Sequence, residues 1–163
     1  MSGPGNIFDL YSSLGFFQAL ESKSAGGCVP GVAGNDIDLQ GYQGCVFVVN
    51  VGAINFTGTS ALHLRLQHAK VSTAGGAGTY SNVPNSLLIH SVAGGYDSTA
   101  ETGMWHSMLS TTTSTLFAVG YKGLADYRYV RLYVSGDGTA GSMQAGAICL
   151  LGANNWPVNT PIN

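Results

Sequence analysis

The sequence predicts a single all-β domain, because three observations agree. Two segments alternate apolar and polar residues, two others are apolar at nearly every position, and glycine-rich breaks separate them. About eight short antiparallel strands joined in this way are typical of a sandwich, a barrel or a jelly roll. The 163 residues can bury a full core and show no repeat and no linker. We therefore expect one domain over residues 14–163, preceded by an arm.

The arm spans residues 1–13. It opens with glycine and proline and then places its apolar side chains singly, which favours an extended segment that docks on another protein. Apolar residues at helical spacing between Ile7 and Phe17 leave an amphipathic helix open as the alternative. The candidate contact residues of the arm are Ile7, Phe8, Leu10 and Tyr11.

Strict alternation predicts two half-buried strands, over 62–68 and 127–135. In the first strand, leucines at every second position face the core, and His63, Arg65 and Gln67 face outward. In the second strand, valine and leucine face the core. Its outward side chains are Tyr129, Arg131 and Tyr133.

Two further segments, 45–51 and 145–151, are apolar on both faces. This pattern indicates strands that lie in the middle of a sheet or that a neighbouring chain covers. Shorter strands are expected over 15–21, 37–40, 86–92 and 115–121. The connections over 71–85 and 93–114 are long enough to carry contacts, and Trp105 in the second is a candidate contact residue.

Charged residues make up 9% of the chain, against about 25% in typical soluble domains. Such a chain must cover itself with neutral polar groups or hide its surface against partners. The net charge is −2 and the six basic residues are scattered, so we expect no nucleic-acid partner. No stretch is long and apolar enough for a membrane span, and no signal peptide is evident, so we expect synthesis in a cytoplasm with reduced cysteines.

The spacing of reactive residues predicts no enzyme, cofactor or metal site. The four histidines form no metal-ligand pattern, and no nucleophile elbow or phosphate loop is present. Asp36 and Asp38 do not fit a calcium loop and are interpreted as turn formers. The outward trio Tyr129, Arg131 and Tyr133 fits a protein interface, a cross-strand tyrosine pair on a solvated face, or a platform for stacking a sugar.

Four segments, taken in order, resemble a known family. They read IDLQGY at 37–42, LRLQH at 64–68, GYKG at 120–123 followed by YRYVRL at 127–132, and GAI with LG at 146–152. Over about residues 14–158 this order resembles small virion proteins of tailed bacteriophages, in particular head decoration (cement) proteins. The resemblance implies a jelly-roll sandwich that forms a homo-oligomer, a trimer, on the outer surface of a capsid made in the bacterial host cytoplasm.

The leading hypothesis is therefore a non-catalytic decoration protein whose partners are the major capsid protein and copies of itself. Its arm and loops would clamp neighbouring capsid subunits. The alternative is a carbohydrate-binding or tail-fibre (receptor-binding) module, in which Trp105, Tyr129 or Tyr133 stacks on a sugar ring.

Overall fold

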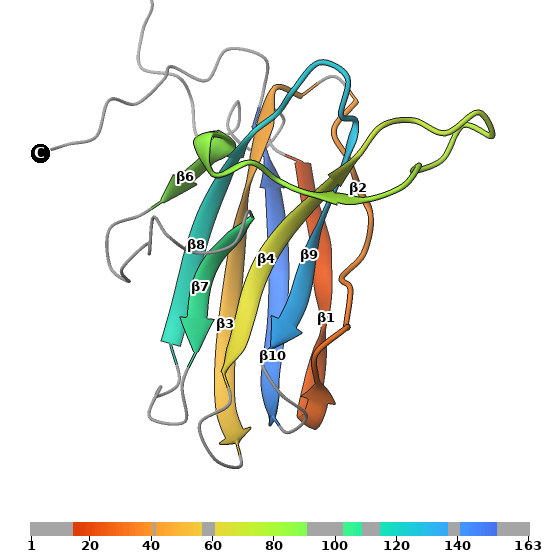
Figure 1. The fold of residues 1–163 in the computed structure, drawn as a ribbon. Helices are drawn as coiled ribbons and strands as arrows, with labels where there is room; N and C mark the ends of the chain where they lie inside the picture. Colours follow the sequence, from red (N-terminus) through yellow and green to blue (C-terminus); the bar gives the residue numbers. More distant parts are fainter. Residues whose placement is uncertain are drawn as a thin grey trace, which may run out of the picture.

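The computed structural model describes residues 15–40, 42–56, 61–90, 103–108, 115–136 and 141–152. Within these ranges nearly all regular structure is strand, and the one helical element is a single 3-10 turn, η1 (Asn85–Leu87) (Figure 1). The chain forms an all-β sandwich, as the sequence predicts.

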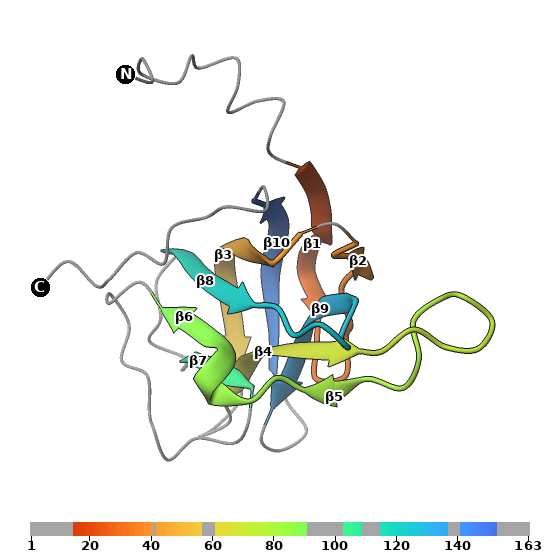
Figure 2. The same cartoon turned by 90° about the horizontal axis from the view of Figure 1, so that it is seen from above.

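The strands form two antiparallel sheets that lie in separate layers when viewed from above (Figure 2). Sheet A has the order β1-β10-β3-β8-β6, and sheet B has the order β2-β9-β4-β5, with β7 also paired to β4. The strands of sheet A are β1 (Gly15–Cys28), β10 (Gly141–Leu151), β3 (Gly44–Phe56), β8 (Thr115–Lys122) and β6 (Leu88–His90). Those of sheet B are β2 (Ile37–Asp38), β9 (Tyr129–Gly136), β4 (Leu62–Ala69), β5 (Ser81–Asn82) and β7 (Met104–Met108).

Four antiparallel strand pairs are nested along the chain. β1 pairs with β10, β2 with β9, β3 with β8, and β4 with β7. One long hairpin rolled up in this way places β1-β10-β3-β8 in one layer and β2-β9-β4-β7 in the other, which is the connectivity of a jelly roll. β5 and β6 add to it by pairing with β4 and β8.

The core lies between the two sheets and is built by the alternation that the sequence displays. Every second residue of β3, β8 and β10 points toward sheet B, and the leucines and valines of β4 and β9 point back. The largest side chains that are fully enclosed there include Phe47, Tyr121, Leu64, Leu132 and Met143. This layer rests on apolar burial alone, apart from His68 and the hydroxyl of Tyr121, which share a hydrogen bond of 2.9 Å.

Two strands lie inside segments that the sequence predicts to be loops. β5 falls within 71–85 and β7 within 93–114, and both pair with the edge of β4 that faces away from β9. Neither sequence alternates, so neither predicts a strand. They are strands because the buried edge of β4 would otherwise leave backbone N–H and C=O groups without partners. The prediction of unbroken loops was wrong at these two places.

The first strand is longer than predicted. β1 continues to Cys28 instead of ending at 21, with register shifts after Gln18, Leu20 and Lys23. Phe17 pairs with Cys149 inside this strand, so an amphipathic helix that extends to Phe17 is excluded. The arm itself, residues 1–13 with its candidate contact residues, lies outside the described residues.

The sequence predicts a half-buried strand over 62–68, but the structure encloses this strand on both faces. His63 and Arg65 point away from the core, yet each is only 7% exposed. β4 is flanked by β9 on one side and by β5 and β7 on the other, and Arg65 donates a hydrogen bond from Nε to the hydroxyl of Ser135 on β9. Neighbouring strands therefore cover polar residues that alternation alone places in solvent.

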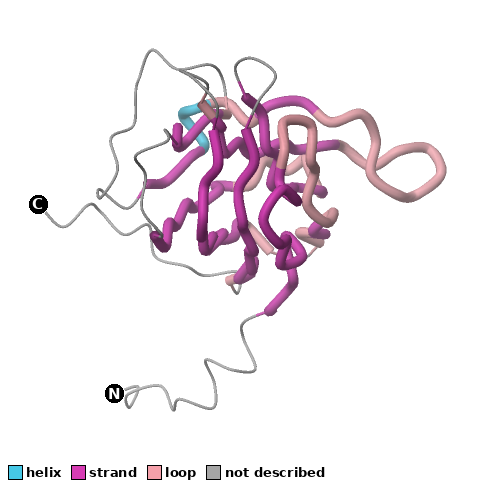
Figure 3. Tube along the Cα trace, turned by 90° about the horizontal axis from the view of Figure 1, so that it is seen from below, coloured by secondary structure: helices cyan, strands magenta, loops and turns pink. Residues whose placement is uncertain are grey.

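The connection from β4 to β5 projects from the sandwich, as the pink extension in Figure 3 shows. Backbone hydrogen bonds close it into a turn. The Ser72 N–H donates to the carbonyl of Gly76, and the Gly78 N–H donates to the carbonyl of Lys70. Gly75 supplies the positive φ of 90° that the turn requires.

The start of β9 is fastened to β2 by an ion pair that the sequence did not predict. The Arg128 guanidinium donates from Nε and Nη2 to the two carboxylate oxygens of Asp38, at 2.7 and 2.6 Å. The same carboxylate accepts the backbone N–H of Gln40, so the interpretation of Asp38 as a turn former is confirmed. The bond from Arg128 holds the pKa of Asp38 below its usual value.

Candidate functional site

The outer face of sheet A is the side that points away from the core, and it is unusually apolar. The cross-strand register arranges its side chains in three rows that run across the sheet. The first row is Phe16, Leu150, Val46, Gly120 and Ile89; the second is Gln18, Ile148, Val48 and Ala118; the third is Gly146, Asn50 and Leu116.

Several large side chains of these rows are left in solvent. Leu116 is 67% exposed, Ile89 59%, Phe16 56% and Ile148 48%. They include four of the eight large apolar residues that are exposed in the described part of the chain, gathered on one face. An antiparallel sheet with one face in water ordinarily carries polar residues there, so this face departs from the usual alternation.

The two central strands of this face carry no charge. β3 and β10 contain 13 and 11 residues, none of them Asp, Glu, Lys or Arg. Charged residues appear only on the flanking strands, as Glu21 and Lys23 in β1 and Lys122 in β8. The sequence prediction of strands at mid-sheet is thus confirmed for both, and their outward sides are not covered by the described residues.

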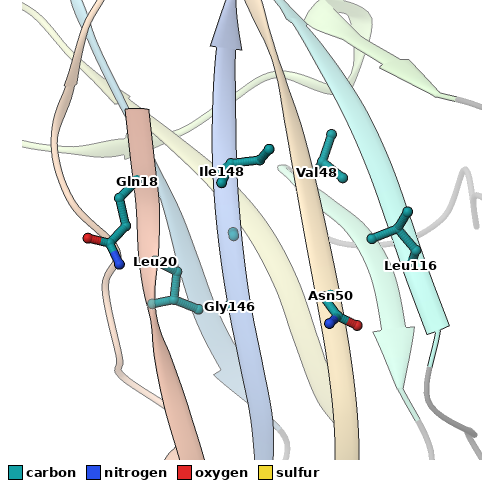
Figure 4. Close-up of a pocket in the computed structure, with 8 residues that line it drawn as sticks. Gln18, Leu20, Val48, Asn50, Leu116, Gly146 and Ile148 are labelled. Carbon is teal, nitrogen blue, oxygen red and sulfur yellow. The ribbon is translucent and has the colours of Figure 1, made fainter. Parts of the chain in front are cut away.

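A shallow hollow of about 370 Å³ opens on this face. Gly146 lies on β10 between Leu20 and Asn50, where the missing side chain leaves a gap (Figure 4). Ile148 and Leu116 stand at its margins, and Asn50 is the one side chain of the central strands there that offers polar atoms. The lining residues are Gln18, Leu20, Val48, Asn50, Leu116, Gly146, Ala147 and Ile148.

No family model, curated protein or solved structure matches the chain. The chemistry of the outer face of sheet A is that of a surface suited to apolar contact.

The outer face of sheet B differs, because its polar side chains bond to one another. The Arg131 guanidinium lies 3.7 Å from the centre of the Tyr80 ring and donates from Nε and Nη2 to Oε1 of Gln67. Gln67 in turn donates from Nε2 to the side-chain oxygen of Asn82 at 3.2 Å. Burial, together with the nearby Asp36 carboxylate, raises the pKa of the Tyr80 hydroxyl well above its usual range.

The structure places the predicted trio of β9 as the alternation requires. Tyr129, Arg131 and Tyr133 point away from the core and are partly exposed. The Tyr129 hydroxyl donates to the carbonyl of Gly75 in the projecting turn, and Arg131 belongs to the network with Tyr80. Their role as a contact surface stays a prediction.

The other predicted contact residues are not brought to this site. Trp105 lies in β7, and its side chain is outside the described part of the structure. The arm residues Ile7, Phe8, Leu10 and Tyr11 also lie outside it.

His68 has a well-defined set of partners and serves the fold. Its ring stacks on Tyr127 with centroids 3.8 Å apart and shares a hydrogen bond with the hydroxyl of Tyr121. Burial lowers its pKa below the usual value. Among the described residues no three histidine, cysteine, aspartate or glutamate side chains are grouped to hold a metal ion.

Two of the predicted reduced cysteines are observed. Cys45 and Cys149 are buried, unbridged and in contact across β3 and β10. Burial raises the pKa of the Cys45 thiol, so it acts as a small apolar group. Cys28 ends β1, and its side chain is not among those described. No helix in the described ranges has the length and hydropathy needed to cross a membrane.

The sequence signalled the apolar face only in part. Apolar residues on both sides of 45–51 and 145–151 predict that a second surface is covered. Leu116, Ile89 and Phe16 come from segments that the sequence predicts only as short strands. Only the register between strands far apart in the chain shows that they share rows.

Proposed function

We propose that the chain is a non-catalytic structural protein of a virion, of the head decoration type. It binds the outer surface of a bacteriophage head and stabilises contacts between major capsid subunits. The observation that carries the proposal is the outer face of sheet A, whose central strands carry no charge and which holds Phe16, Ile89, Leu116 and Ile148 in solvent. Apolar surface gathered in this way favours burial against protein.

The fold is compatible with two classes of function, since both viral capsid domains and lectins use jelly rolls. The chemistry of the two outer faces separates them. A sugar platform needs an aromatic face and polar groups that are free to bond a ligand, whereas Arg131 covers the Tyr80 ring and its donors are directed at Gln67. The apolar face offers what a protein partner needs, so the assembly role ranks first.

The scarcity of charge supports the same role. A chain with 9% charged residues keeps few groups for solvation, and the two central strands of sheet A, β3 and β10, place no ionised group in a contact. The turn that projects between β4 and β5 and the arm over residues 1–13 are the segments proposed to reach the capsid, leaving the sheet face for a contact within the assembly.

The test is reconstitution on capsids that lack this protein. Purified chain is added, bound protein is measured by co-sedimentation, and the capsids are then heated. We expect binding to the outer surface and a higher temperature of capsid disruption than for capsids without the protein. Absence of binding, or equal resistance to heat after binding, would contradict the proposal.

A glycan array run on the same preparation addresses the carbohydrate alternative. We expect no binding. Sugar binding that Tyr133→Ala abolishes, with no affinity for capsids, would transfer the assignment to the alternative.

A further inference from the structure

We infer that the outer face of sheet A pairs with the same face of a second copy of the chain, through a two-fold axis that runs along β3. This inference deepens the proposed function, on which it rests, by naming the partner of that face. It follows from the arrangement of large and small residues on the two strands that flank β3.

In each row, a large residue on one side of β3 is matched by a small residue on the other side. Asn50 of β3 lies between Gly146 of β10 and Leu116 of β8. In the next row, Val48 lies between Ile148 of β10 and Ala118 of β8. The small residue is thus on β10 in one row and on β8 in the next.

A two-fold axis that lies above β3 and runs parallel to it places β8 of one copy over β10 of the other. Each row of one copy then faces the same row of the other copy. Leu116 of each copy then lies over Gly146 of the other, one of the residues that line the hollow. Ile148 of each copy lies over Ala118 of the other. Two sheets packed with their strands nearly aligned is the usual geometry of a sandwich, so the contact needs no new packing mode.

The remaining row fits less tightly but does not oppose the contact. Leu150 is matched by Gly120, and the space beside Gly120 is already flanked by Ile89, whose Cβ lies 3.0 Å from where a Cβ on Gly120 would stand. Ile89 and Phe16 then lie at opposite margins of the face, where they add apolar area at the rim of the contact.

The electrostatics of self-pairing are favourable. The chain has a net charge of −2, so a charged face would repel its own copy, but the rows contain no charged side chain. Asn50 lies on the axis and meets Asn50 of the other copy, where two side-chain amides can hydrogen-bond to each other. The one polar position at the centre of the face therefore has a partner in the pair.

The size of the face suits a modest dimer. Five strands about 4.8 Å apart and three rows spaced by two residues give a footprint of roughly 20 by 20 Å. Because side chains make this surface uneven, two copies would bury about 1,000 Å² in total. This area is near the lower end of the range for specific protein–protein interfaces. We expect a dimer that dissociates on dilution.

The first experiment is sedimentation equilibrium of the full chain over a wide concentration range. We expect the mass to rise from the monomer value of 16.8 kDa toward twice that value. Leu116→Asp is expected to weaken the pairing about tenfold or more, because it buries a carboxylate in an apolar hollow. Leu124→Asp is the matched control, since Leu124 is a leucine 40% exposed outside this face, and it is expected to leave the mass unchanged.

The second experiment tests the axis itself. A chain with Asn50→Cys and Cys28→Ser is treated with a short bis-maleimide, the two remaining cysteines being buried. We expect rapid cross-linking of Asn50→Cys to a covalent dimer and little cross-linking of Lys122→Cys, which lies at the far end of β8. Folding of each variant is checked by its circular dichroism spectrum.

A monomer at all concentrations, a trimer, or a dimer that Leu116→Asp leaves intact would overturn the inference. A monomer that still protects capsids, and loses that ability on Leu116→Asp, would overturn self-pairing and leave the proposed function in place, with capsid protein as the partner of the face. A dimer that does not bind capsids would uphold self-pairing and contradict the proposed function.

Discussion

The two outer faces of the sandwich differ in which side chains they expose to solvent. On sheet B, polar side chains satisfy one another, through contacts such as Arg131 with Gln67 and Tyr80. On sheet A, large apolar side chains such as Leu116 and Ile148 stand in solvent beside a hollow. The polar side chains of sheet B thus bond within one copy of the chain, whereas the apolar rows of sheet A leave large side chains open to contact.

The largest effect is expected at Arg65, on the face that is complete. Arg65→Ala removes a side chain that is 7% exposed together with its hydrogen bond to Ser135. We expect a loss of about 2 kcal/mol in the free energy of unfolding, because the packing of the aliphatic part of the arginine side chain and its hydrogen bond are lost together. Urea denaturation measures it, and a loss no larger than that of an exposed loop substitution would contradict the view of this face as structural.

Arg131→Ala is expected to have a smaller effect on the same face. It removes the contact with the Tyr80 ring and leaves the side-chain oxygen of Gln67 without its donor. The expected loss is about 1–2 kcal/mol, measured in the same way. If Arg131 served mainly as a contact residue for another protein, unfolding of the isolated chain would hardly change.

Between pH 5 and pH 7, stability is expected to depend on pH through His68, which lies between the sheets. Burial lowers the pKa of His68 in the folded chain, so the unfolded chain binds the proton more readily. Stability is therefore full above about pH 6.5, the usual pKa of histidine, and falls as the pH drops below that value toward the folded-state pKa. Urea midpoints between pH 5 and pH 7 measure the slope.

The matched variant for this effect is His68→Gln. It is expected to be less stable at neutral pH because it loses the stacking on Tyr127, but its stability should no longer fall over this pH range. A slope unchanged by the substitution would place the titration elsewhere. Asp38 acts in a different window: its pKa is lowered, so its contribution is present above about pH 4 and is lost as the pH falls through the folded-state value.

The smallest effect on stability is expected on the apolar face. Leu116 is 67% exposed, so Leu116→Ser should change the free energy of unfolding by less than about 0.5 kcal/mol when the chain is dilute. Arg131→Ala, measured beside it, provides the contrast between the faces. A large loss at Leu116 in the dilute chain would mean that the face is already packed within one copy.

The sequence predicts the sandwich because its central strands are patterned locally. The alternation over 127–135 and the two-sided apolar runs at 45–51 and 145–151 correspond to β9, β3 and β10. β5 and β7 carry no such pattern, because the backbone of β4 imposes their pairing from a distance. Gly103, just before β7, shows how this is done: it accepts the N–H of Leu66 through its carbonyl and adopts a φ of 80°.

From the sequence, only part of the outer face of sheet A could be predicted, namely that its central strands are apolar on both sides. Two apolar sides of one strand indicate that something covers the second side, but they do not show what lies beside it. The match of Leu116 with Gly146 depends on the register of β8, β3 and β10, whose residues are far apart in the chain. For the polar face, the sequence predicts outward side chains but not their partners. The pattern of Tyr129, Arg131 and Tyr133 does not reveal that Tyr80 and Gln67 contact the arginine.

The most direct test of the account is to ask which outer face becomes covered on assembly. Hydroxyl-radical footprinting of the chain, first dilute and then concentrated or bound to capsids, reports the solvent access of single side chains. The account predicts that Leu116 and Ile148 lose most of their reactivity while Tyr133 keeps its own. Protection of Tyr133 with unchanged reactivity of Leu116 and Ile148 would contradict it.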